Sequence, residues 1–240
     1  MYDKLYARWK GVVLTAEAEV EVESSAAQAE EEEESDLLPW ANIKFSNTIA
    51  PEQARLDEVN TYISAKGERM NAAELAKYKY HIDIGGGGGT TWTGTIAKLA
   101  MPGLLFHHVT PTTDYIHDYK MKPWIHYVPI KADLSDLREK YEWAESHPQV
   151  AKLIASQGSE LVRYWTSSDG FGEMYQDIFV DQVRQVIEAY QPISTTNPDS
   201  NWEKELANYE GKTFEAKIMC SGKGLCFDIP TEEQLSLKSI

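Results

Sequence analysis

Residues 78–101 read YKYHIDIGGGGGTTWTGTIAKLAM, and this stretch decides the fold class. Residues 78–84 are rich in aromatic and β-branched side chains and predict a strand. Five glycines follow at 85–89, and a helical stretch is expected from about residue 94 to 101. The sequence therefore predicts a strand, a glycine-rich turn and a helix in direct succession.

The chain on either side of this stretch continues the pattern. Strands are predicted at 104–109 and 126–130, and this alternation with helices is typical of an α/β layered domain. Downstream, Asp133 is expected to cap a helix that runs to Ser146, Pro148 to open the next one, and Gly158 to end it at C′. A further helix is expected at 159–165 and a long one at 172–190. Its apolar positions at helical spacing are expected to be core: Ile178, Phe179, Val183, Val186 and Ile187.

A glycine-rich turn between a strand and a helix is a candidate phosphate site. Backbone N–H groups converge there, the helix dipole adds positive potential, and glycine lets the backbone approach a ligand closely. The alternative is a flexible glycine loop without a ligand. The candidate contacts are Gly86, Gly87, Gly88, Gly89, Thr90, Thr91, Trp92, Thr93 and Thr95. Asp83, just before the turn, is interpreted as structural, bonding N–H groups of the loop.

The turn does not match the common phosphate-binding motifs. A P-loop is excluded because no Gly-Lys-Ser/Thr follows the run. A dinucleotide fingerprint would need a third glycine at Thr90 and an acidic residue after the next strand, where His107-His108-Val109-Thr110 stands instead. A nicotinamide cofactor therefore remains only an alternative.

Histidines near the second strand raise the question of a metal. His107 and His108 should point to opposite faces of their strand, so they cannot easily share an ion, and His117 and Asp118 do not change this. We expect no metal site. One of the pair, His107, could instead face a ligand at the carboxyl end of its strand, and a hydrogen-bonded, partly buried histidine is the other interpretation.

The composition excludes several classes of partner. The formal net charge is −15, with 23 Lys and Arg against 38 Asp and Glu, which disfavours nucleic acid and anionic membranes. No transmembrane segment or signal peptide is recognised. Cys220 and Cys226 could form a small disulfide loop or remain thiols.

Charge also suggests the domain organisation. Residues 1–36 are expected to be disordered, because they include alternating glutamates at 17–23 and an acidic run at 30–34. The period of two in residues 16–23 would also fit an edge strand. Residues 37–192 are expected to form the α/β domain, which the family resemblance described next implies to be a nucleotide-sugar-binding domain. Residues 193–240 are expected to form an appendix with a hairpin at 214–229.

Several segments resemble one known family. They are KYKYHIDI, TTWTGTIAKLAMPGLLFHH, KPWIHYVPIKADLSDL and EWAESHPQVAKLIASQGSELVRYW, and together they resemble the C-terminal half of glycosyltransferase family 90, the capsule-associated proteins and protein O-glucosyltransferases. The resemblance covers residues 40–190, and its most specific segment is 122–129 followed by Asp133-Leu134.

This resemblance implies a GT-B fold with two Rossmann-like domains. Family members transfer glucose or xylose from a UDP-sugar to a protein or glycan hydroxyl, with inversion and without an essential metal. It places the turn 86–95 on the donor and adds His126 and Tyr127 as walls of the nucleotide pocket. It also implies the lumen of the endoplasmic reticulum or Golgi.

The sequence departs from the family in two respects. The family often has an arginine for the diphosphate at the helix start, whereas Thr93-Gly94-Thr95 carries no charge here. Unless Lys98 or another base compensates, donor affinity should fall, and Thr95→Arg should restore it. The acceptor domain with the catalytic carboxylate is also mostly missing, so we name no catalytic base.

Three functions remain open. The first is a UDP-sugar-dependent glycosyltransferase or its donor-binding half. The second is a non-catalytic remnant that binds a sugar nucleotide or a protein. The third is a nicotinamide-dependent oxidoreductase.

Overall fold

The computed structural model describes residues 6–26, 38–46, 50–85, 93–110 and 119–190, and Thr231. The glycines from residue 86, the segment with His117 and Asp118, both cysteines and the expected hairpin lie outside these ranges.

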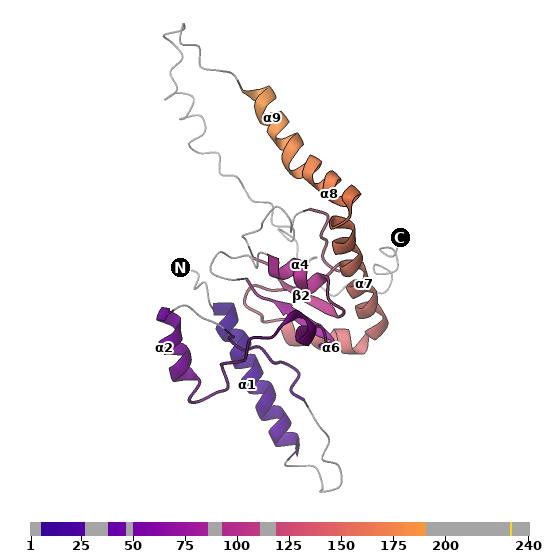
Figure 1. Ribbon diagram of the computed structural model, residues 1–240. Helices are drawn as coiled ribbons and strands as arrows, with labels where there is room; N and C mark the ends of the chain where they lie inside the picture. Colours follow the sequence, from indigo (N-terminus) through magenta and orange to yellow (C-terminus); the bar gives the residue numbers. More distant parts are fainter. Residues whose placement is uncertain are drawn as a thin grey trace.

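Three short parallel strands form the centre of a mixed α/β fold (Figure 1). They are β1 (Tyr80–Asp83), β2 (Leu104–His108) and β3 (Val128–Ile130), in the order β1-β2-β3. Helix α4 (Thr93–Leu99) lies between β1 and β2 in the chain. The three predicted strands and this helix are confirmed, each within a few residues of the expected ends.

Side chains of β2 alternate between two hydrophobic clusters, as expected for a strand covered on both faces. Leu104 and Phe106 belong to a cluster shared with α6 (Leu137–Ser146), the first half of α7 (Pro148–Trp165) and Ala7. Leu105 belongs to a second cluster. The other buried members of that second cluster are Leu99, Met121, Tyr127, Val162 and Trp165.

The N-terminal segment corrects one expectation, because α1 (Tyr6–Ala26) is a helix rather than disordered chain. Its buried positions follow helical spacing: Ala7, Gly11, Val12, Thr15 and Ala18. Two of its glutamates form salt bridges with residues distant in sequence: Glu19 lies 3.1 Å from Lys44, and Glu21 lies 2.5 Å from Arg138. The alternation of glutamates therefore suggested the wrong period.

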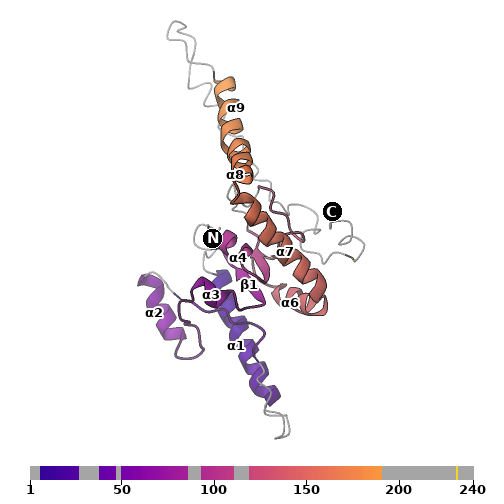
Figure 2. The same cartoon turned by 45° about the vertical axis from the view of Figure 1, so that its right-hand side comes forward.

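The elements that follow α1 lie beside it (Figure 2), and Phe45, Leu56 and Ala65 share a hydrophobic cluster with Val12. Within this part of the chain, Phe45 and Lys66 form an isolated parallel β-bridge. Helix α2 (Ala50–Val59) follows, and α3 (Ala72–Leu75) begins with a capping box. In that box the Asn71 side chain accepts from the Glu74 backbone and the Glu74 side chain accepts from the Asn71 backbone.

Helix α6 starts later than predicted, since Asp133 caps only the turn at Ser135. Helix α7 is one continuous helix, so the end predicted at Gly158 is wrong. A Cβ atom at Gly158 would lie 2.7 Å from the carbonyl oxygen of His126 and 2.9 Å from Leu99. This glycine permits a close helix approach instead of ending the helix.

The long helix is present but does not join the core. It consists of α8 (Ser168–Tyr175), the π-helical turn η1 (Gln176–Val180) and α9 (Asp181–Ala189), and it extends away from the sheet (Figures 1 and 2). Four of the five expected core residues are exposed by 39–68% of their area, and Ile178 is half-buried. The four exposed ones are Phe179, Val183, Val186 and Ile187.

Candidate functional site at the carboxyl ends of the strands

A buried polar cluster lies where β1 and β2 end. The register places Asp83 directly beside His107. The Asp83 carboxylate accepts hydrogen bonds from the Thr95 hydroxyl at 2.5 Å and the Lys98 ammonium at 2.6 Å, and it lies 3.3 Å from His107 Nδ1. Two strands and the helix after the glycine turn therefore meet at one carboxylate.

The local sequence explains this arrangement. Thr95 and Lys98 are three residues apart on α4, so they share a face, and that face lies against β1. Asp83 is completely buried. Burial alone would raise the pKa of Asp83, but the hydrogen bond with His107 and the charge of Lys98 hold this pKa well below its usual range. The cluster is thus built around an ionised carboxylate.

Asp83 was interpreted as structural, and the structure supports that role with different partners. Its described bonds are to side chains of α4 and β2, whereas the expected bonds were to N–H groups of the loop. The missed partner is Lys98, which the i, i+3 spacing from Thr95 could have revealed.

These contacts also change the expectation for the missing arginine. Lys98 is paired with Asp83 and its side chain is only 27% exposed, so its charge is already compensated within the protein. Thr95 is buried, and an arginine at that position would compete with Lys98 for the same carboxylate. We therefore expect Thr95→Arg to destabilise the cluster rather than simply to strengthen donor binding.

Tyr127 contacts the buried cluster around Asp83, whereas His126 takes no part in the described hydrogen bonds of that cluster. The Tyr127 ring is buried and meets the His107 ring edge-on, with centroids 5.0 Å apart. The imidazole of His126 instead accepts a hydrogen bond from the Lys122 backbone N–H at 2.9 Å. Burial, and then the charge of Lys122, lower the pKa of His126 to about 4.

His108 points away from His107, as its place on the strand predicted. Its Nδ1 accepts from the N–H of Gly85 at 3.1 Å, and its Nε2 lies 2.8 Å from the carbonyl oxygen of Ala132. The start of the glycine run is therefore tied to the loop after β3. Over the described ranges, no three side chains of metal-binding type come together.

A second buried pair holds the loop after β3. The Asp136 carboxylate accepts from the Lys131 backbone N–H at 2.9 Å and lies 3.8 Å from the Lys140 ammonium. Lys140 is 2% exposed and lies over the Trp124 ring, 5.4 Å from its centroid. Burial raises the pKa of Asp136. The loop that follows β3 is thus tied to the start of α6.

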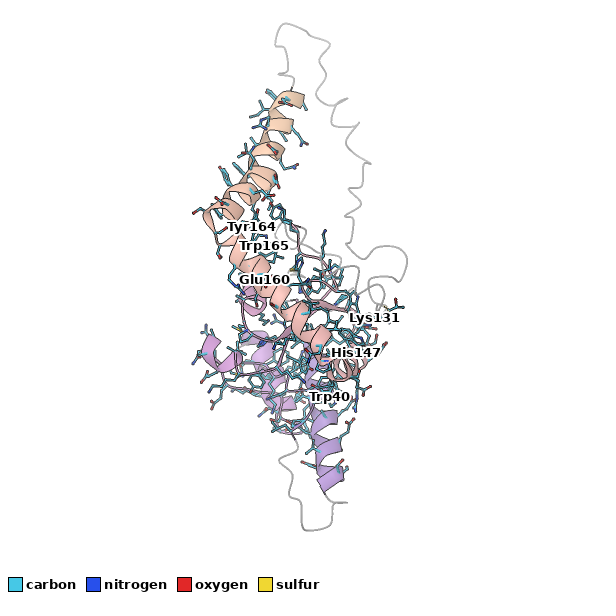
Figure 3. All side chains as sticks on the ribbon, turned by 90° about the vertical axis from the view of Figure 1, so that its right-hand side faces the viewer. Trp40, Lys131, His147, Glu160, Tyr164 and Trp165 are labelled. Carbon is cyan, nitrogen blue, oxygen red and sulfur yellow. The ribbon has the colours of Figure 1, made fainter. Side chains whose placement is uncertain are left out.

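Of the predicted donor contacts, the structure brings Thr95, His107 and Tyr127 together. Thr93 begins α4, and the six residues Gly86, Gly87, Gly88, Gly89, Thr90 and Thr91, with Trp92, lie outside the described ranges. Figure 3 shows the side chains around this body, with His147 at the start of α7 and Tyr164 and Trp165 at its end. No helix among the described residues is both long and apolar enough to cross a membrane.

Comparison with known proteins gives a consistent result. The profile of "Glycosyl transferase family 90" matches residues 6–200. "Protein O-glucosyltransferase 2" of Danio rerio is 35% identical over 113 residues, 44% of this chain and 21% of that protein. The human "Protein O-glucosyltransferase 3" is 35% identical over 103 residues, 41% of this chain and 19% of that protein. The human "Protein O-glucosyltransferase 1" is 32% identical over 94 residues, 39% of this chain and 23% of that protein. The matched region therefore spans about a fifth of the length of these relatives.

Proposed function

The chain belongs to glycosyl transferase family 90, and from this membership we propose that it binds a UDP-sugar as the donor-binding part of a glycosyltransferase. The sugar is a hexose or pentose, and the acceptor is a hydroxyl group of a protein or glycan. The name of the relatives supports glucose and a protein hydroxyl as the first pair to test. We assign the parallel sheet to the Rossmann-like donor domain of a GT-B fold.

One observation carries this proposal: the buried cluster of Asp83, Thr95, Lys98 and His107 stands where β1 and β2 end. Open parallel sheets bind ligands at the carboxyl ends of their strands. The cluster joins β1, β2 and α4 on both sides of the glycine run, so it fixes the two ends of the turn. Backbone N–H groups of such a turn can hold a diphosphate although the whole chain is acidic.

The chemistry proposed is a direct displacement. The acceptor hydroxyl attacks the anomeric carbon, a carboxylate base takes its proton, and UDP leaves with inversion. Donors on the turn stabilise the negative charge that develops on the departing diphosphate, without an essential metal. Within this chain we assign donor binding to the turn, His107 and Tyr127, and we assign no residue as the base.

A ligand-dependent melting experiment tests the donor site. The midpoint of thermal unfolding is measured with UDP, UDP-glucose, UDP-xylose and NAD. A ligand at a hundred times its dissociation constant adds about 2.7 kcal/mol, which corresponds to a shift of roughly 5–10 °C for a chain of this size. We expect shifts with the uridine compounds and none with NAD.

Two variants make the experiment specific. His107→Gln changes the cluster beside the turn and should reduce the shift with UDP-glucose. Ile187→Ala, on the exposed face of α9, should leave it unchanged. A shift with NAD alone would favour the oxidoreductase alternative. Binding of UDP-glucose without transfer to any acceptor would favour a non-catalytic remnant.

The compartment is part of the proposal. We place the protein in the lumen of the endoplasmic reticulum or Golgi by analogy with its family. Protease protection of the protein in sealed microsomes tests this, and digestion without detergent would contradict it.

A further inference from the structure

We propose that His108 is a positioning residue for the donor site: its neutral ring fastens Gly85 to the loop after β3, and its protonation releases Gly85 and weakens donor binding. This inference rests on the function proposed above, because it concerns the same turn. His108 makes no contact with the substrate in this scheme and acts only through Gly85.

The two hydrogen bonds of His108 require one tautomer. The carbonyl oxygen of Ala132 can only accept, so Nε2 must carry the hydrogen that bridges their 2.8 Å. The N–H of Gly85 can only donate, so Nδ1 must be the bare nitrogen across 3.1 Å. The ring is therefore neutral and bonded at both ends, and it is 5% exposed.

Protonation breaks one of these bonds selectively. A hydrogen on Nδ1 would face the hydrogen of Gly85, whereas the bond from Nε2 to Ala132 would persist. The ring would thus stay attached to the loop and lose the start of the glycine run. Neutral His108 holds Gly85, and charged His108 repels it.

The surroundings of His108 favour the neutral form. Burial lowers the pKa of His108 first, the bond to Ala132 opposes this, His107 of β2 lowers it further, and Asp83 of β1 raises it. In the loop after β3, the Asp136 carboxylate is already turned to the Lys131 N–H and to Lys140. The bridge is therefore intact at neutral pH and opens only in acid.

The bridge matters because its far end is rigid. Ala132 lies between Lys131, whose N–H is bonded to buried Asp136, and the turn capped by Asp133. Gly85 is the first of the five glycines and is itself buried. Fixing Gly85 to this loop sets the point at which the chain leaves β1 at the proposed donor site.

Binding of UDP-glucose between pH 5 and 8 tests the inference, with calorimetry on the whole chain. UDP-glucose is the probe because its diphosphate is esterified at both ends and does not titrate in this range. For the unmodified chain, we expect an affinity that is constant from pH 8 to about pH 6.5, because the pKa of His108 lies below the ordinary histidine value. The affinity should fall at more acidic pH, by about three- to tenfold once His108 is protonated and one neutral hydrogen bond is lost.

Three variants separate positioning from general destabilisation. His108→Gln can accept from Gly85 through Oε1 and donate to Ala132 through Nε2, but it does not titrate, so its affinity should stay high and flat with pH. His108→Leu makes neither bond and should bind weakly at every pH. His147→Asn changes a histidine at the junction of α6 and α7, leaves both bonds of His108 in place, and should retain the pH profile of the unmodified chain. A pH profile of His108→Gln equal to that of the unmodified chain would overturn the inference.

A second measurement works without any ligand. In a pH titration by NMR, the Gly85 amide resonance should move with the protonation of His108 in the free chain and should not do so in His108→Gln. If the amide responds but UDP-glucose does not bind, the bridge stands and the proposed function fails. If the Gly85 amide is insensitive to His108, the bridge itself is refuted.

Discussion

Helices α7 and α9 have similar sequence patterns and opposite surroundings. Both carry apolar residues at helical spacing. In α7 these side chains are buried, as Ile154 at 1% and Val162 at 6% exposure show. In α9, Val186 and Ile187 are 68% and 67% exposed. Amphipathic spacing therefore identifies which face of a helix is apolar, but it does not say whether another element covers that face.

The difference arises from what each helix meets. Helix α7 packs against β2, α4 and α6, so its apolar face closes the core of the sheet. Lys120 pairs with Glu173 of α8, and the Tyr119 hydroxyl donates to Asp177 of η1 at 3.1 Å, so both elements are joined to the body. These polar contacts use the side of the helix that faces the body. Met174 of α8 packs against the second hydrophobic cluster, whereas Val186 and Ile187 of α9 are exposed.

The largest expected contrast comes from truncating an isoleucine in each helix. Ile154→Ala leaves a cavity in the core and should lower the free energy of unfolding by about 2–5 kcal/mol. Ile187→Ala removes an exposed side chain and should change it by less than about 0.5 kcal/mol. Urea unfolding of both variants measures this. An equal loss in both would mean that α9 is covered in solution.

The second largest contrast is the loss of unfolding free energy when a buried or an exposed carboxylate is neutralised. Asp83→Asn removes the charge that holds Lys98, Thr95 and His107, and should cost about 1.5–3 kcal/mol. Asp181→Asn affects an exposed pair with Arg184, 2.8 Å away, and should cost less than about 1 kcal/mol.

The pH dependence sharpens the carboxylate comparison. Because the folded pKa of Asp83 is depressed, its stabilisation is complete above the unfolded pKa of about 3.9 and is lost only as the pH falls through the folded pKa. The cost of Asp83→Asn should therefore remain constant from pH 7 to pH 5. A cost that vanished by pH 5 would contradict the low pKa.

Two glycines should respond with opposite signs. Gly158→Ala places a methyl group 2.7 Å from a backbone carbonyl oxygen and should destabilise by about 1–3 kcal/mol, although alanine favours helices. Gly172→Ala, in α8, meets nothing within 4 Å and should stabilise by about 0.5–1 kcal/mol. Thermal unfolding of the pair decides, and stabilisation by Gly158→Ala would show that α7 can move away from His126.

The last prediction is a change of stability with pH, and it concerns the body because all six histidines precede α8. His126 has a folded pKa of about 4, below the unfolded value of about 6.5, so the unfolded chain binds more protons between these values. Stability should be constant above about pH 6.5 and fall toward pH 4, with a shallower fall in His126→Asn. Urea titrations at half-unit pH steps measure this. An identical slope in both chains would show that His126 titrates normally.

The sequence alone predicted secondary structure correctly where the local residue pattern and the tertiary contacts favour the same element. The aromatic and β-branched residues before the glycine run, and the helix after it, predicted β1 and α4. Helix α1 was missed because its glutamates at every second position suggested a period of two. Their cations, Lys44 and Arg138, are distant in sequence, so the compensation is visible only in the fold.

The candidate site follows the same rule. Thr95 and His107 were predicted from their place beside the turn, and the family membership was confirmed by the profile match. The role of Asp83 as a shared acceptor depends on the register of β1 against β2. The bridge at His108 depends on a carbonyl group 24 residues further along the chain, which no spacing rule predicts.

The π-helical turn η1 determines the geometry of the exposed apolar residues. Side chains four residues apart drift by about 40° per step around an ideal α-helix, so a row repeating every four residues winds around it. Such a row runs through Phe171, Tyr175, Phe179 and Val183. A π-helical turn holds one extra residue and so offsets the accumulated drift once. The π-helical turn therefore rotates the later residues of the row back toward the side of the helix on which the row began. The four apolar side chains then lie along one side of the helix instead of winding around it.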